Sequence, residues 1–210
     1  MVKNPPDVYI SPNYKSDKLD SPSIDDLIDV YEDRIVGWVL DPAAQLADTA
    51  NGAPAALCLL LTYFEGAWSY RTRTSSDGRS REYFISGFVD VFKSPNNSPE
   101  LLRKLGAVLY RDARCGFFHE GLFRDRIYVA TMNRDIVITL PRRKGQLDLE
   151  GEIQSALIDV RRCIEGAKKH LAAAIAELRD PDNTLGREAF ATYFKKMCDW
   201  EGDGPVVALD

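Results

Sequence analysis

The sequence has only two histidines, His119 and His170, in 210 residues. Its four cysteines are widely spaced, and no pair of them has the spacing of a zinc site. It also has no glycine-rich phosphate loop and no paired carboxylates at the spacing of a metal site. These absences count against nucleotide binding or transfer and against metal-dependent chemistry, and we expect neither a metal nor a cofactor.

Long apolar runs are missing as well. The most apolar stretch, from Ala53 to Phe64, is about a dozen residues long, whereas a membrane-spanning helix needs about 20. Residues 1–12 contain no apolar run after the lysine, which predicts no secretion signal. We therefore expect a cytoplasmic protein that does not enter a membrane and keeps its cysteines reduced.

The formal charge of −5 argues against a protein that coats nucleic acid over its whole surface. The charge is unevenly distributed, however. Residues 101–144 contain ten Lys or Arg and four Asp or Glu, whereas the rest of the chain has a balance of −11. A local basic segment on an acidic protein suits an enzyme that binds a few phosphates, although ordinary solvated charges would give the same count.

Apolar periodicity predicts one mostly helical domain over residues 23–200, between a flexible arm at 1–22 and a polar tail at 201–210. Ser23 opens the first helix, and Asp41-Pro42 ends it. The other helices are expected at 53–70, 81–93, 98–114, 149–179 and 185–200. The second of these six helices is apolar almost all round and should be the central one. The fifth carries a coiled-coil-like seam, which packs on the bundle or on a second subunit.

A β-hairpin insertion is expected at about 124–143, because apolar residues alternate over 127–131 and again over 136–140. Two strands alone are marginally stable, so the hairpin should lie beside a site rather than in the core. It carries four arginines, which either grip an RNA backbone or are plain surface charges: Arg124, Arg126, Arg142 and Arg143.

One stretch of the basic segment places Arg114 and His119 at the end of a predicted helix. An imidazole transfers protons near neutral pH, and a guanidinium holds phosphate through several hydrogen bonds. Residues five apart on an α-helix point about 140° away from each other. Because Gly116 lies between the two, we expect the helix to break there and His119 to turn back toward Arg114. Phe117 and Phe118 would then anchor the exit segment in the core.

The pattern of Arg114, four residues and His119 resembles the motif of the HEPN superfamily, and the residues from Tyr110 to Gly121 look like those of prokaryotic HEPN-like proteins. The resemblance implies an all-α, HEPN-like helical bundle of four to six helices with an up-and-down core, often a homodimer. It also implies that Arg114 and His119 are the catalytic pair of a metal-independent endoribonuclease. Its partners would be RNA, a second copy, and a cognate antitoxin or phage-defence protein.

Cys115 departs from the family pattern, in which Asn, Asp or His commonly follows the arginine. Asp112 follows Arg111 instead, so this pair is a second reading of the motif, with a longer gap to His119. The departure keeps an alternative open, in which the chain is a non-catalytic HEPN-like binding or assembly module. In such a module His119 would be buried and hydrogen-bonded.

Two glutamates are supporting candidates. Glu65 either faces the motif, where it orients Arg114 or Arg111, or is a solvent-facing residue at a helix end. Glu120 directly follows the histidine of the motif.

The chemistry expected of this pair is cleavage of RNA. His119 would take the proton from the ribose 2′-hydroxyl or give one to the leaving oxygen, and Arg114 would stabilise charge on the phosphate. The reaction needs the 2′-hydroxyl, which makes RNA and not DNA the expected substrate. One histidine is few for both proton transfers, and two motifs face to face in a homodimer would supply two. We expect His170, which follows two lysines on the long helix, to be solvated.

Overall fold

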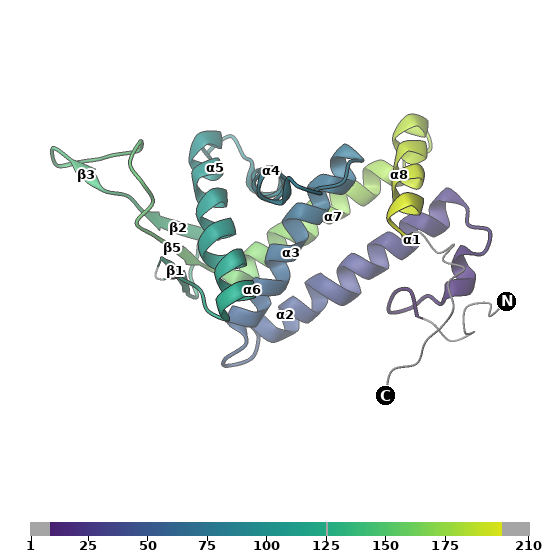
Figure 1. Ribbon diagram of the computed structural model, residues 1–210, viewed down its shortest axis with the longest axis horizontal. Coiled ribbons are helices and arrows are strands. Elements are labelled where there is room, and N and C mark those ends of the chain that lie inside the picture. Colours follow the sequence, from purple (N-terminus) through teal and green to yellow (C-terminus); the bar gives the residue numbers. More distant parts are fainter. Residues whose placement is uncertain (1–8, 125, 199–210) are drawn as a thin grey trace.

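The computed structural model describes residues 9–124 and 126–198 and is mainly helical, with a small share of strand (Figure 1). The α-helices are α1 (Ile24–Ile35), α2 (Asp41–Ala47), α3 (Ala53–Thr72), α4 (Ser80–Phe92), α5 (Pro99–Val108), α6 (Gly116–Glu120), α7 (Val160–Arg179) and α8 (Thr184–Met197). Three further helical turns are η1 (Ser16–Leu19) and the π-helical η2 (Val36–Leu40) and η3 (Leu109–Cys115). The strands are β1 (Ile127–Val129), β2 (Ile136–Thr139), β3 (Arg142–Arg143), β4 (Gln146–Leu147) and β5 (Ser155–Ile158). The mainly helical class is therefore confirmed.

Helix α3 is the central helix, as its apolar sequence predicts. It contacts α2, α4, α7 and α8, and buried residues occur along its whole length. Phe64 is fully buried in it, and its ring meets the rings of Phe84 and Phe88 on α4 edge-on, with centroid distances of 5.6 and 5.4 Å. No helix in the described part of the chain is long and apolar enough to cross a membrane.

The first predicted helix does not end at Asp41-Pro42, because α1, η2 and α2 form one continuous rod (Figure 1). Inside an α-helix a proline lacks the N–H donor, and its ring clashes with the carbonyl four residues earlier. Here the N–H of Asp41 bonds to the carbonyl of Val36, which widens the turn directly before Pro42. The wider turn accommodates the proline, and the helix continues to Ala47.

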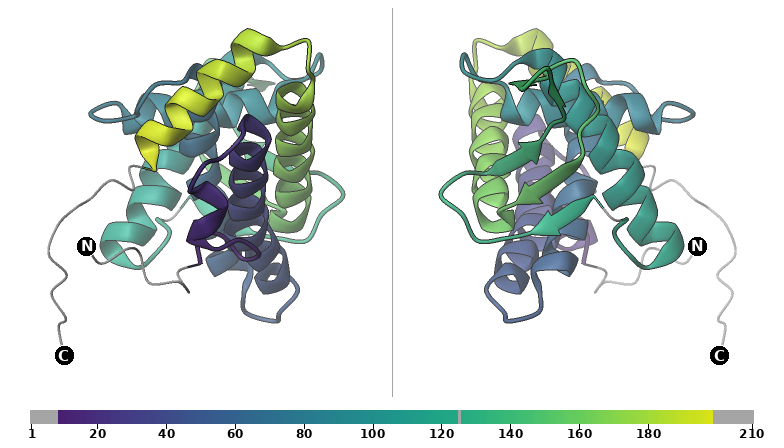
Figure 2. Two further views of the ribbon diagram at one scale, coloured as in Figure 1. Left: turned by 90° about the vertical axis from the view of Figure 1, so that its right-hand side faces the viewer. Right: turned by 90° about the vertical axis from the view of Figure 1, so that its left-hand side faces the viewer.

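The strands do not form the predicted hairpin insertion. Strand β5 lies between β1 and β2 in a three-stranded sheet, parallel to β1 and antiparallel to β2 (Figure 2). Ala156 at its centre is opposite both Ile127 and Ile138 and is fully buried, so a strand on each side satisfies its backbone. Among the described residues, β3 and β4 form a hairpin instead, and its turn residues Lys144 and Gly145 both have positive φ.

Helix α7 begins at Val160, not at Leu149 as predicted. Asp159 is buried before its first turn and accepts a hydrogen bond from the N–H of Arg162 (3.2 Å). The same carboxylate accepts one from the N–H of Met132 (2.7 Å), in the loop between β1 and β2. This N-cap therefore fixes both the start of the helix and the position of the sheet.

From residue 9 onward the predicted N-terminal arm packs on α1. Asn13 donates to the carboxylate of Asp33 from its backbone N–H (2.8 Å) and from its side-chain amide (2.7 Å). The remainder of the arm, residues 1–8, and the predicted tail, 201–210, lie outside the described residues.

Candidate active site

The predicted motif lies on one uninterrupted helical rod formed by α5, η3 and α6 (Figure 1). Gly116 has φ −55° and ψ −49°, which are helical values, so the predicted break at this residue is wrong. The rod ends at Gly121, whose φ of 72° is left-handed and whose N–H bonds to the carbonyl of Phe117 (2.9 Å). Glycine at this position avoids the cost that a side chain would meet at positive φ.

Gly116 instead allows the segment that follows the rod to pack closely against it. A Cβ at this position would lie 2.8 Å from the carbonyl oxygen of Leu122 and 3.3 Å from the Cγ of Arg124. The chain folds back over the rod here, and the N–H of Arg124 bonds to the carbonyl of Asp112 (2.9 Å). The glycine thus holds the exit segment against the motif.

Arg114 is held in a defined position. Its guanidinium carbon lies 5.4 Å from the ring centroids of both Tyr110 and Phe118, four residues away on either side. Its Nη2 is 3.8 Å from Oε2 of Glu65 on α3. The arginine side chain remains 31% exposed and borders a cavity of about 300 Å³ between α3, the loop before α4, and α8. It is therefore positioned but accessible.

Glu65 is positioned in turn. Its Oε1 accepts hydrogen bonds from the hydroxyls of Ser76 (2.7 Å) and Ser80, which precede and begin α4. The carboxylate therefore reaches Arg114 from a fixed place, and of the two alternatives expected for Glu65 the structure shows the one beside the motif.

His119 is exposed on the last turn of the rod. In the described part of the chain its imidazole makes no hydrogen bond or ion pair, and no interaction joins it to Arg114. Glu120 pairs with Arg124 (2.5 Å), and its pKa is lowered mainly by this hydrogen bond.

The aromatic residues after Gly116 only partly follow the prediction. Phe117 is half-buried against Phe123, with ring centroids 5.6 Å apart. Phe118, in contrast, is 55% exposed, and Leu122 is 70% exposed. Because the helix continues past the glycine, Phe118 faces outward instead of entering the core. Phe118, His119 and Leu122 thus form an exposed patch, which we call the motif patch.

The second reading of the motif, Arg111 with Asp112, gives a closed ion pair. The Nε and Nη2 of Arg111 each lie 2.6 Å from one carboxylate oxygen of Asp112. This bidentate bond raises the pKa of Arg111, and Asp112 itself is buried. The charge of Arg111 is therefore compensated more closely than that of Arg114, whose carboxylate partner is 3.8 Å away.

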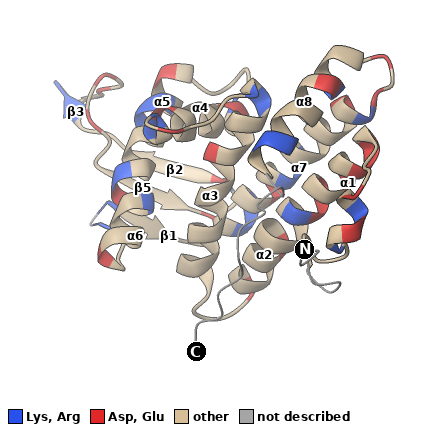
Figure 3. Cartoon of the chain, turned by 45° about the vertical axis from the view of Figure 1, so that its right-hand side comes forward, with Lys and Arg blue, Asp and Glu red and all other residues tan. Residues whose placement is uncertain are grey.

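The four arginines predicted to grip RNA are not gathered in one place. Arg124 pairs with Glu120, and Arg126 donates to the carbonyl of Ile153 (3.0 Å). Arg142 and Arg143 are exposed on β3, on a hairpin that extends from the body of the molecule (Figures 1 and 3). Arg142 and Arg143 form no ion pair within the described residues, whereas Arg124 and Arg126 each have an acidic partner.

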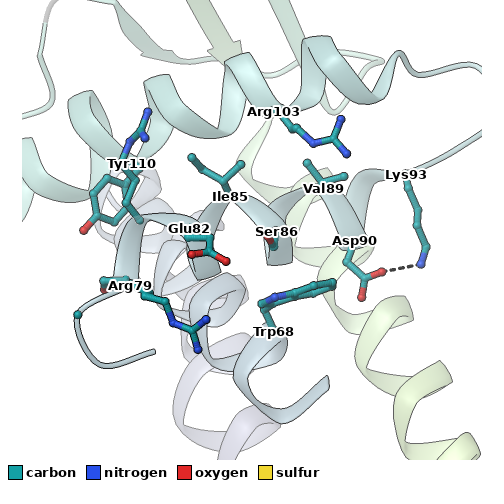
Figure 4. A pocket seen from close by; sticks show the side chains of 13 residues that line it. Trp68, Arg79, Glu82, Ile85, Ser86, Val89, Asp90, Lys93, Arg103 and Tyr110 are labelled. Carbon is teal, nitrogen blue, oxygen red and sulfur yellow. Dashed lines mark hydrogen bonds and ion pairs between the residues drawn. The ribbon is translucent and has the colours of Figure 1, made fainter. Parts of the chain in front are cut away.

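A groove that the motif did not indicate runs along α4, between α3 and α5, with a volume of about 970 Å³ (Figure 4). Its border combines two aromatic rings, four cations and two acids: Trp68, Tyr110, Arg79, Arg81, Lys93, Arg103, Glu82 and Asp90. Lys93 and Asp90 form an ion pair with each other (2.5 Å). Arg81 and Arg103 make no ion pair within the described residues. Since Tyr110 also contacts Arg114, the groove begins beside the motif. Sequence reasoning missed it because its residues come from three separate helices.

The described residues contain no group of three or more His, Cys, Asp or Glu side chains that could hold a metal ion. Comparison of the chain with protein-family models, with curated proteins and with solved structures found no match.

Proposed function

We propose that this chain is a metal-independent endoribonuclease that acts through Arg114 and His119 of two copies. The observation that carries the proposal is the exposure of His119, which no hydrogen bond or ion pair engages within the described residues, at the end of the same rod that holds Arg114 beside Glu65. A buried, hydrogen-bonded histidine would have favoured a purely structural role. The resemblance of this stretch to the HEPN motif supports the same choice, with a toxin–antitoxin or phage-defence context.

The chemistry follows from these two groups. His119 of one copy removes the proton of the ribose 2′-hydroxyl, whose oxygen then attacks the adjacent phosphorus. The bond from phosphorus to the 5′-oxygen breaks, and the histidine of the second copy gives that oxygen a proton. Arg114 stabilises the charge that gathers on the phosphate oxygens during the attack. The products are a 2′,3′-cyclic phosphate and a 5′-hydroxyl.

RNA recognition is assigned to the groove along α4. Trp68 and Tyr110 offer rings on which bases stack, and Arg81 and Arg103 offer cations for phosphates. The groove leads to Tyr110, which contacts Arg114, so a bound strand would reach the motif. An acidic chain can bind RNA in this way because the positive charge is needed only locally.

The test uses a short RNA and a matched strand in which one ribose at the cleaved position is replaced by 2′-deoxyribose. We expect the purified chain to cut the RNA in the presence of a chelator, to leave a 2′,3′-cyclic phosphate, and to spare the deoxy position. Cleavage that needs a divalent metal, or that proceeds at the deoxy position, contradicts the proposed chemistry.

Pairing of two copies is assigned to the motif patch, because it exposes two large apolar side chains beside His119. We expect Leu122→Asp to convert a dimer into a monomer in analytical ultracentrifugation and to abolish cleavage, since a buried charge at an interface is strongly unfavourable. Leu185→Asp is the matched control, because Leu185 is 81% exposed on α8, and it should stay dimeric and active. A wild-type chain that is active as a monomer would rule out the shared site.

One observation favours a second function. Within a single copy Arg114 is engaged by Glu65 and two rings, and no contact within the described residues joins it to His119, so the pair is not assembled for catalysis. The chain would then be a non-catalytic binding or assembly module of the HEPN type. Retention of RNA binding or dimer formation, with no cleavage under any of the conditions above, would identify this function.

A further inference from the structure

Helices α1, α3, α7 and α8 surround a cavity of about 480 Å³ that lies apart from the motif. Much of its wall is made by small residues of three facing helices: Ala67, Ala173, Ala174, Gly186 and Ala189. The rings of Tyr31 and Tyr70 border the cavity, with centroids 4.3 Å apart. A volume of this size is in the range of sites that hold small organic molecules, about 300–1,000 Å³.

His170 lies in the wall of this cavity and is not solvated as predicted. Its Nδ1 is 2.8 Å from the hydroxyl of Tyr63, and its Nε2 is 3.0 Å from Oδ2 of Asp90. Burial acts to raise the pKa of Asp90, but hydrogen bonds from Lys93 and His170 outweigh burial and lower it (Figure 4 shows the Lys93 contact). Asp90 is therefore a carboxylate that pairs with Nε2 of His170, while Nδ1 of the same ring shares a hydrogen bond with the hydroxyl of Tyr63.

Arg73 lines this cavity together with Arg71 and Glu177. Arg71 pairs with Glu177 at 2.6 Å, but Arg73 forms no ion pair or hydrogen bond within the described residues. Its guanidinium carbon is 5.7 Å from the ring centroid of Phe190, which is fully buried. Burial lowers the pKa of Arg73. Glu177 acts in the opposite direction on the pKa of Arg73 through its charge, but its direct contact goes to Arg71, so the guanidinium of Arg73 is open to an anion as a direct partner.

The backbone of Arg73 points to the same conclusion. Its φ of 57° is left-handed, at the position where α3 ends. Glycine is the usual residue at such a helix end, because a side chain is unfavourable at positive φ. The chain nevertheless places a long cationic side chain at this point, directed to a cavity that it lines.

We propose that this cavity binds a small organic anion, whose phosphate or carboxylate group pairs with Arg73 and whose flat apolar body lies between Tyr31, Tyr70 and the alanines of α3 and α7. The hydrogen-bonded side chains of Tyr63, His170 and Asp90 form another wall of the cavity and fix the orientation of the bound molecule. This site uses neither Arg114 nor His119, although Asp90 and Lys93 line both this cavity and the groove along α4.

Isothermal titration calorimetry on the full chain tests the proposal with four probes: phenyl phosphate, phenylacetate, inorganic phosphate and the neutral phenylacetamide. We expect phenyl phosphate or phenylacetate to bind with a Kd below about 100 μM. Phenylacetamide should bind at least about tenfold more weakly, since it has no charge for Arg73. The comparison of the first two probes identifies the head group.

Arg73→Gly removes the guanidinium and relieves the left-handed strain, so the variant should fold with an unchanged or higher Tm. We expect its affinity for the organic anion to fall at least about tenfold. Lys144→Gly is the matched control, because Lys144 is also a basic residue at positive φ (53°) but lies on the hairpin, and it should bind like wild type. Equal binding by Arg73→Gly, equal binding of phenylacetamide, or binding of inorganic phosphate alone overturns the proposal, as does the absence of binding by all probes.

Discussion

His119→Ala should lower the rate of RNA cleavage by about 10²–10⁴-fold, because general acid–base catalysis contributes about this much and the imidazole is the group that moves the proton. The variant should fold like wild type, since His119 is exposed and its ring makes no hydrogen bond or ion pair in the described part of the chain. Single-turnover cleavage of a labelled RNA measures the rate, and circular dichroism and Tm check the fold.

Lys169→Ala is the control for this experiment. Lys169 is an exposed cation on α7, so its removal changes the net charge without touching the motif or the groove. Lys169→Ala should cleave RNA at the wild-type rate. His119→Ala should still bind RNA, because the groove lies on other helices. Equal cleavage by His119→Ala and wild type would exclude His119 from catalysis.

Phe64→Ala should destabilise the fold by about 3–5 kcal/mol, which is the usual cost of removing a large aromatic side chain from a core. Phe64 is 1% exposed, and its ring lies against those of Phe84, Phe88 and Phe92. The substitution leaves a cavity between α3 and α4 and removes the ring contacts with α4. Urea unfolding followed by circular dichroism measures the change in free energy.

Leu185→Ala is the comparison for Phe64→Ala. Leu185 is 81% exposed on α8, so truncation of its side chain leaves no internal cavity, and its free energy of unfolding should change by no more than about 0.5 kcal/mol. If Phe64→Ala cost as little as this surface change, α3 would not be the centre of the core.

The helices with clear local signals could be predicted from the sequence. Ser98 accepts a hydrogen bond from the N–H of Leu101 and Pro99 occupies the first turn, as their residue types indicate. The central position of α3 can also be predicted, because a helix that is apolar on every side has to be buried. In both cases the information lies within one segment of the chain.

Other features depend on contacts that local patterns do not contain. Ile153 and Leu157 continue the apolar spacing of α7, so the residues of β5 look like the start of that helix. Pairing with β1 and β2 makes them a strand instead. Gly116 has the residue type of a helix end, but its use is set by Leu122, which packs over it.

The candidate site likewise combines residues that the sequence predicts with features that depend on tertiary contacts. The sequence indicates Arg114 and His119, which lie in a recognisable motif, and Glu65, which is an acid in an otherwise apolar helix. It gave no sign of the groove along α4, or of the partners of His170, which lie 107 and 80 residues away at Tyr63 and Asp90. Side chains that converge from several helices are visible only once the helices are packed.

The position of β5 between β1 and β2 has a consequence for synthesis of the chain. Both outer strands leave the ribosome before their common partner, so their hydrogen-bonding edges stay open until Ser155–Ile158 has emerged. The helices up to α5 can pack during that interval, and the sheet closes only with the strand that immediately precedes α7. A nascent chain that stalls before Ser155 therefore exposes two unpaired strand edges. Such edges promote aggregation, so we expect a chaperone to bind the stalled chain.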